Sequence, residues 1–225
     1  LTAKMATTLD HVSGGRMILG LGAGWFAREH EAFGFDFGTG IGERLDRLGE
    51  AVPLIRRLLD GETVTHEGRF YRLHDAVCAP RPVQERVPIL VGGSGPKKTL
   101  PLVARHADMW NTYGSPDELA ASDAILRAAC KVVGRDEREI ERTVNVNVVI
   151  RPTRAEAEQA WAGWMRTHRT QEGEDHLDAA GPLDEVADSL QRLADVGFAH
   201  PVLVFRTPFD LETIERLPDL RAAMD

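Results

Sequence analysis

The sequence predicts an α/β fold with a parallel sheet. Roughly five predicted strands alternate with helices or helical regions along the chain. A hairpin over residues 62–72 is inserted into this order. Strict alternation of strand and helix favours parallel strands joined by right-handed crossovers. An open doubly wound sheet fits this pattern, and so does most of a (β/α)8 barrel, which typically needs about 250 residues.

Length and composition fit one globular domain covering residues 1–225. The 225 residues are 43% hydrophobic and 28% charged, which is enough to bury a sizeable core. The net charge of −8 argues against broad affinity for nucleic acid or for an anionic membrane. Cys78 and Cys130 lack the spacing of metal or redox sites. We expect reduced, packed thiols, which favour a cytoplasmic protein.

The first residues have the pattern of a helix that is already under way. Leu1, Met5 and Leu9 recur at helical spacing without a capping residue before them, and Gly14 and Gly15 end the helix. A barrel that lacks its first three strands would fit both this start and the strand count. We therefore expect that the sequence lacks the first three β/α units of the natural domain.

The next segments give a strand, a loop, a helix and the hairpin. The apolar run over residues 16–22 predicts a strand, and the Phe- and Gly-rich residues 25–42 predict a long loop. An apolar stripe over residues 43–60 predicts a helix that Gly61 ends. Within residues 62–72, Glu67-Gly68 forms the predicted turn of the hairpin.

The second half repeats the order of strand and helix. Capping boxes at Ser115–Glu118 and Thr153–Glu156 predict two helix starts, and Pro182 opens a further helix. The polar residues 169–181 predict a loop. The predicted strands are 88–92, 107–112, 143–150 and 201–206, and the predicted helices are 97–106, 116–134, 182–197 and one from about Leu211.

The first glycine-rich turn follows the predicted strand 16–22. Residues 22–27 satisfy the dinucleotide pattern G-x-G-x-x-A. That fingerprint requires a helix at the turn and a second strand after it, whereas a Phe/Gly loop follows here, so a Rossmann site is disfavoured. Glycines chosen for tight packing are one alternative. We favour a strand end whose backbone lies against a flat ring.

The second glycine-rich turn follows the predicted strand 88–92. Pro96 stands where a Walker P-loop and a nucleophile elbow both require glycine, so neither motif is complete. Backbone N–H groups at a helix start, the Ser94 hydroxyl, Lys97 and Lys98 would together suit a phosphate. A plain strand-to-helix turn with solvated lysines is the alternative.

Several other residues lie at strand ends or in the long loop. Trp110 and Asn111 end a predicted strand, where Trp110 fits a ligand pocket and the core equally well. Arg206 ends the last predicted strand, where a barrel places its site. The aromatic rings of the loop from Trp25 to Gly42 suggest a lid, or a loop packed on the rim. The sequence identifies neither a metal site nor a catalytic acid or base.

These motifs together resemble the luciferase-like monooxygenase family, and most closely its branch that uses the deazaflavin coenzyme F420. The resemblance is specific to about residue 150 and looser afterwards. It implies an amino-terminally truncated (β/α)8 TIM barrel in which residues 16–22 are the fourth strand and the hairpin is an insertion. The segments that carry it are Leu1–Asp10, Ser13–Arg16, Gly20–Trp25, Glu43–Leu45, Glu67–Tyr71, Pro88–Gly95 and Ala107–Asn111.

The resemblance also implies roles for individual residues. Related sugar-phosphate dehydrogenases have a catalytic Glu where Trp25 stands here, so that particular activity is in doubt. The residues implied beside the cofactor ring are Gly22, Ala23 and Gly24, those at its phosphate are Gly92, Gly93, Ser94, Gly95, Lys97 and Lys98, and those of the substrate pocket are Trp25, Trp110, Asn111 and Arg206.

The implied reaction is hydride transfer between F420 and a small organic substrate. The alternatives are an FMN-dependent monooxygenase with a partner reductase and a truncated barrel that binds without turnover. A hydrolase that uses Ser94 is disfavoured by Pro96. A small-molecule substrate is the expected partner, with a homodimer and a reductase as further candidates.

Overall fold

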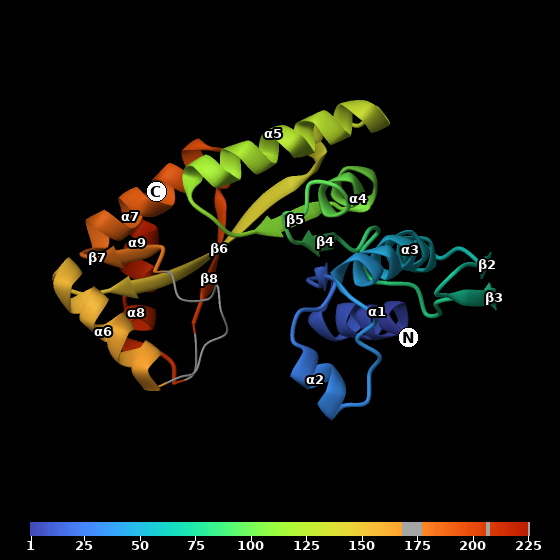
Figure 1. The fold of residues 1–225 in the computed structure, drawn as a ribbon, viewed down its shortest axis with the longest axis horizontal. Coiled ribbons are helices and arrows are strands. Elements are labelled where there is room, and N and C mark those ends of the chain that lie inside the picture. The colour runs from blue at the N-terminus through green and yellow to red at the C-terminus, as the bar shows by residue number, and fades with distance from the viewer. Residues whose placement is uncertain (168–176, 206–207, 225) are drawn as a thin grey trace. The chain divides into compact units, whose positions relative to one another are not determined.

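The computed structural model describes residues 1–167, 177–205 and 208–224 (Figure 1). The chain forms two compact units, each with its own parallel strands and buried side chains. The single domain predicted over residues 1–225 stays a prediction. Unit 1 comprises Leu1–Asn111 and Ser122–Glu141, and unit 2 comprises Thr112–Ala121 and Arg142–Asp225.

Unit 1 contains three short parallel strands in the order β1-β4-β5. Leu21 of β1 lies opposite Val91 of β4, and Gly92 of β4 lies opposite Asn111 of β5. The predicted α/β class with parallel strands is confirmed. The elements are α1 (Thr2–Ser13), β1 (Leu19–Leu21), α2 (Ala27–Ala32), α3 (Ile41–Leu59), β2 (Val64–Glu67), β3 (Arg72–Ala76), β4 (Ile89–Gly92), α4 (Thr99–His106) and β5 (Met109–Thr112), and α5 (Pro116–Val133) belongs to both units.

Two of the predicted helices of unit 1 agree closely with the structure. Helix α1 ends at Gly14, whose φ of 65° is the left-handed conformation that glycine adopts readily. Helix α3 matches the predicted helix 43–60 and contains Pro53. The predicted loop 25–42 contains the short helix α2, which the sequence did not reveal because none of its residues is buried and it has no side-chain cap.

The predicted hairpin forms as β2 and β3, but its predicted turn at Glu67-Gly68 is wrong. Glu67 is the last residue of β2 and pairs with Arg72 of β3, so the turn comprises residues 68–71, where the Gly68 N–H donates to the Tyr71 carbonyl at 3.0 Å. The Glu50 carboxylate of α3 accepts hydrogen bonds from the backbone N–H groups of Phe70 (3.1 Å) and Tyr71 (2.9 Å). Burial alone would raise the pKa of Glu50, but these hydrogen bonds and one from His66 lower it overall. A Cβ at Gly68 would clash with the Glu50 carboxylate and the His66 ring, so a side chain there would displace Glu50 from the hydrogen bonds that join the hairpin to α3.

The Asp108 carboxylate, just before β5, joins three segments of unit 1. Its Oδ2 accepts hydrogen bonds from the Ile89 backbone N–H (2.8 Å) and from the guanidinium of Arg56 on α3. Its Oδ1 accepts a hydrogen bond from Arg86 at 2.9 Å. Arg56 also donates to the Val87 carbonyl at 2.9 Å. Burial lowers the pKa of Arg56, because it disfavours the charged guanidinium, and the negative charge of Asp108 partly offsets this effect.

Unit 2 is built on the long strand β6, which pairs in parallel with β7 through Val148 and Ala179 and with β8 through Asn145 and Val202. Helices α7 and α9 lie side by side (Figure 1). The elements are β6 (Glu141–Ile150), α6 (Arg154–Thr167), β7 (Ala179–Gly181), α7 (Leu183–Asp195), β8 (His200–Val204), α8 (Leu211–Glu215) and α9 (Leu217–Met224).

The sequence located most of unit 2. Both predicted capping boxes form: Glu118 Oε2 accepts a hydrogen bond from Ser115 N at 2.8 Å, and Glu156 Oε2 accepts one from Thr153 N at 3.0 Å. Strand β7 lies at the end of the predicted loop 169–181. Its Ala-Ala-Gly sequence contains no β-branched or aromatic residue, so it carries no strand signal.

The structure also describes the surroundings of the two cysteines and the hydropathy of the helices. Cys78 and Cys130 are both buried and neither is in a disulfide, which agrees with the predicted reduced, packed thiols. Among the described residues, no helix combines the length and the apolarity that crossing a membrane requires.

We predict that Asp108→Asn lowers the free energy of unfolding by about 3 kcal/mol, because it leaves the buried Arg56 guanidinium with only its longer ion pair to Asp60 at 3.5 Å. Urea denaturation of the purified chain measures this change. Glu62→Gln is the control, since it removes an ion pair with Arg57 in which both side chains are more than two-fifths exposed, and it should cost less than about 1 kcal/mol. Equal effects of the two substitutions would contradict this account of Asp108.

Candidate functional site

The two glycine-rich turns lie at the same edge of the unit 1 strands. Strand β1 ends at Leu21 and strand β4 ends at Gly92, and their parallel register places these carboxyl ends next to each other. Asn111 of β5 continues the row beside Gly92. In parallel α/β folds this edge is where ligands bind. The structure therefore brings together Gly22, Gly92 and Asn111, which the sequence singled out separately.

The main chain is accessible at Gly22 and Gly92, where β1 and β4 end. No atom lies within 4 Å of the position that a Cβ would take at Gly22, and at Gly92 the nearest atom is the Leu21 carbonyl oxygen at 3.9 Å. Ala23 is half-buried beside them. Gly24 has a φ of 73° and lies near the His30 ring. Because side chains are absent at Gly22 and Gly92, a planar molecule could approach the main chain directly.

The second turn forms two hydrogen bonds with β5. The Gly93 N–H donates to the Asn111 carbonyl at 2.9 Å, and the Gly93 carbonyl accepts a hydrogen bond from Trp110 Nε1 at 2.8 Å. Trp110 is fully buried, which is the core alternative that the sequence left open. Its indole N–H holds the glycine turn from within the core, and its ring does not face solvent.

Backbone donors are available where the second turn leads into α4. The N–H groups of Ser94 and Gly95 donate to no acceptor among the described residues. The Gly95 carbonyl accepts a hydrogen bond from Leu100 N at 3.0 Å, which orients the turn at the helix start. Ser94 is exposed. Two N–H groups and a hydroxyl at a helix start can hold an anion such as a phosphate.

The two lysines after this turn differ in their contacts. Lys98 Nζ donates to Asp46 Oδ1 at 2.5 Å and to the Gly42 carbonyl at 3.0 Å, so its charge is neutralised on α3. Lys97 forms no ion pair with any described residue. Both line a groove of about 430 Å3 between α3 and α4, to which Arg105 contributes a further cation. Of the pair, Lys97 is the cation that remains available to an anionic ligand.

The loop after β1 carries exposed aromatic rings. Trp25 is 64% exposed and stacks on Phe26, with 5.4 Å between the ring centroids. The Arg44 guanidinium lies 3.8 Å from the centroid of the Phe37 ring. Arg47 of α3 forms an ion pair with Asp36 of the loop at 2.5 Å, and this pair connects the loop to α3. The role of this loop as a lid stays a prediction.

The remaining candidates are less defined. Asn111 is half-buried at the end of β5. Arg206 lies outside the described residues. In the described ranges, no three His, Cys, Asp or Glu side chains gather as metal ligands would. The sequence did not reveal the Lys98–Asp46 pair or the hydrogen bond from Trp110 to Gly93, because both join residues that are distant in sequence.

Comparison with known proteins identifies the family. The sequence pattern of the luciferase-like monooxygenases matches residues 1–200. This chain belongs to the luciferase-like monooxygenase family. The resemblance seen in the glycine turns is thereby confirmed.

Relatives of this luciferase-like chain include enzymes named for coenzyme F420. An F420-dependent glucose-6-phosphate dehydrogenase of Kineococcus radiotolerans is 33% identical over 231 residues, which cover 92% of this chain and 67% of that enzyme. An uncharacterized protein of Mycobacterium tuberculosis is 34% identical over 134 residues, which cover 60% of this chain and 46% of that protein. The chain thus spans about half of one relative and two thirds of the other.

A solved structure shares the fold of this luciferase-like chain. An F420-dependent secondary alcohol dehydrogenase, in complex with an F420–acetone adduct, superposes with a TM-score of 0.81 at 21% identity. The match covers 99% of this chain and 74% of that enzyme. At this identity the likeness establishes the fold, and the α/β expectation holds for nearly the whole chain.

We predict that Gly93→Ala lowers the free energy of unfolding by about 1–3 kcal/mol, because Gly93 has a φ of 116°, which is strained for any L side chain. Gly92→Ala is the matched control one residue earlier. Its backbone is not in the left-handed region and its Cβ would meet only ordinary contacts, so a change below about 1 kcal/mol is expected. Thermal and urea unfolding measure both variants. A stable Gly93→Ala protein would contradict the conformation assigned to this turn.

Proposed function

We propose that this chain is the cofactor-binding part of an F420-dependent oxidoreductase. The ring of the deazaflavin would lie against Gly22, Ala23 and Gly24, and its phosphate would lie at Gly92–Gly95. The observation that carries the proposal is the β1–β4 register, which makes the two turns neighbours at one strand edge. The relatives named for F420 support the choice of cofactor.

The residues present fit a flat, anionic group. At Gly22 a Cβ would enter open space, and at Gly92 it would meet only the Leu21 carbonyl oxygen at 3.9 Å, so glycine leaves room there for a planar ring. The free N–H groups of Ser94 and Gly95 suit phosphate oxygens. Lys97 adds a positive charge, whereas Lys98 is held by Asp46. Complementary shape and complementary charge thus occur at adjacent positions.

The chain would bind and orient, and the cofactor would supply the redox chemistry of hydride transfer with a small organic substrate. The glycine edge fixes which face of a bound ring remains open to substrate. The rings of Trp25, Phe33 and Phe35 are exposed on the loop after β1. Closure of that loop over the edge would exclude water from the reacting atoms.

FMN is the alternative cofactor, because it shares a planar ring system and a phosphate with F420. With FMN the protein would be a monooxygenase supplied by a partner reductase. The structure of the glycine edge favours neither ring, so the choice rests on the relatives named for F420. A homodimer and a reductase remain proposals for partners, and the substrate pocket with Trp25 and Asn111 remains a proposal as well.

We predict that the chain binds F420 in preference to FMN and that Gly22→Ala weakens F420 binding at least tenfold. The new methyl group would occupy the space of the ring without disturbing the fold, since no protein atom lies within 4 Å of it. Fluorescence titration of each cofactor measures the dissociation constants.

Gly163→Ala on α6 is the matched control, because its Cβ would meet only an ordinary contact with Arg166 Nη2 at 3.6 Å and the residue belongs to neither glycine turn. It should leave the dissociation constant unchanged. Preference for FMN would assign the monooxygenase alternative. Failure to bind either cofactor, or equal affinities of Gly22→Ala and wild type, would overturn the proposal.

A further inference from the structure

Unit 2 contains a small pocket at the carboxyl ends of two parallel strands. The pocket has a volume of about 190 Å3. Val148 and Val149 near the end of β6 line it, together with Phe205 directly after β8. Trp161 and Trp164 of α6 also line it. All of these residues belong to unit 2.

Two tryptophans give the pocket an aromatic wall. Trp161 and Trp164 are three residues apart on α6, and their rings stack with 5.9 Å between centroids and 23° between planes. Ala160, four residues before Trp164, lies on the same side of the helix and also lines the pocket. Its small side chain leaves the space that a larger residue would fill. Aromatic walls of this kind favour apolar and especially aromatic ligands.

The charged groups at the pocket are already paired. The Arg151 guanidinium contacts Asp210 Oδ1 at 2.9 Å, and it donates to the Ile150 carbonyl at 2.7 Å and to Thr213 Oγ1 at 3.1 Å. Burial alone would raise the pKa of Asp210, but the hydrogen bonds from Arg151 and Thr213 lower it overall. The carboxylate therefore stays ionised, and its charge is balanced by Arg151.

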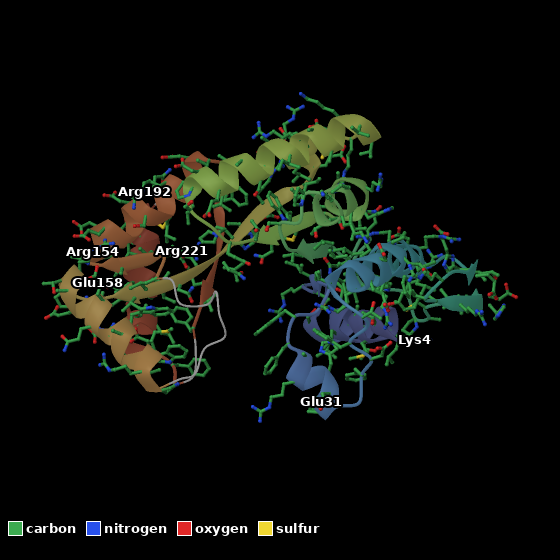
Figure 2. All side chains as sticks on the ribbon, in the orientation of Figure 1. Lys4, Glu31, Arg154, Glu158, Arg192 and Arg221 are labelled. Atoms are coloured by element: carbon green, nitrogen blue, oxygen red, sulfur yellow. The ribbon has the colours of Figure 1, made fainter. Side chains whose placement is uncertain are left out.

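Two charged residues of α6, Arg154 and Glu158, are engaged outside the pocket. Arg154, labelled with Glu158 in Figure 2, forms ion pairs with Glu158 at 3.2 Å and with Glu185 at 3.3 Å. None of these three side chains lines the pocket. An anionic ligand would thus meet no unpaired cation among the described lining residues, and a cation would meet no unpaired carboxylate.

We propose that this pocket binds a small, uncharged, apolar organic molecule, with an aromatic ring as the best fit. Its volume is comparable to the cavity of about 150 Å3 that binds benzene in an engineered protein. The valines and Phe205 supply apolar contact, and the tryptophan rings supply offset stacking. This site goes beyond the function proposed for unit 1, because it requires neither the cofactor nor the glycine turns.

Fluorine NMR of the full chain labelled with 5-fluorotryptophan tests the proposal, with toluene as the probe. The chain contains four tryptophans, and the variants Trp161→Phe and Trp164→Phe assign two of the four signals. We expect saturable shifts of the Trp161 and Trp164 signals, with the Trp25 and Trp110 signals unchanged. Benzoate, which has similar size and a negative charge, should bind at least tenfold more weakly.

A second test uses a substitution that fills the pocket with a larger side chain. Ala160→Leu should weaken toluene binding at least tenfold, whereas Ala162→Leu, at an exposed position of α6, should leave it unchanged. Circular dichroism checks that both variants fold. If Ala160→Leu fails to fold, the wild-type titrations decide the matter alone. The proposal is wrong if the Trp161 and Trp164 signals show no saturable shift, if benzoate binds as tightly as toluene, or if a folded Ala160→Leu protein binds toluene as tightly as the wild type does.

Discussion

The Asp108 carboxylate fixes the part of the fold on which the candidate site depends. It accepts hydrogen bonds from the first residue of β4 and from Arg56 of α3, and it stands directly before β5. A buried guanidinium without this partner would be strongly unfavourable. The amino ends of β4 and β5 are therefore held together with α3 at one point. Because parallel strands keep a fixed register from that point onward, their carboxyl ends also lie at defined positions.

The site follows from what the chain places at those carboxyl ends. Glycines at 22 and 92 remove side chains from the tips, and the buried indole of Trp110 holds the turn at Gly93 by a hydrogen bond of 2.8 Å. The helix start after this turn adds unpaired N–H groups and Lys97. Rigid strands thus present exposed backbone and donors, which is the arrangement that orients a flat, charged cofactor. Membership of the luciferase-like monooxygenase family agrees with this assignment.

The features that the sequence located correctly have local causes. The glycine turns and the capping boxes at Ser115 and Thr153 depend on residues within a few positions of one another. The sequence analysis did not predict helix α2 and strand β7, because both elements are short and their residues carry weak propensity signals. The Asp108–Arg56 pair and the Lys98–Asp46 pair join residues 52 positions apart. Local pattern cannot assign such pairs, and so it could not separate the roles of Lys97 and Lys98.

The central claim is that the turns after β1 and β4 form one binding edge. The most direct measurement is a map of backbone amide chemical shifts in the isotopically labelled chain as F420 is added. The account predicts saturable shifts, with a common dissociation constant, at Ala23, Gly24, Ser94 and Gly95, and unchanged signals at Gly134 and Gly197. Shifts at one turn without the other, or at neither, would contradict it.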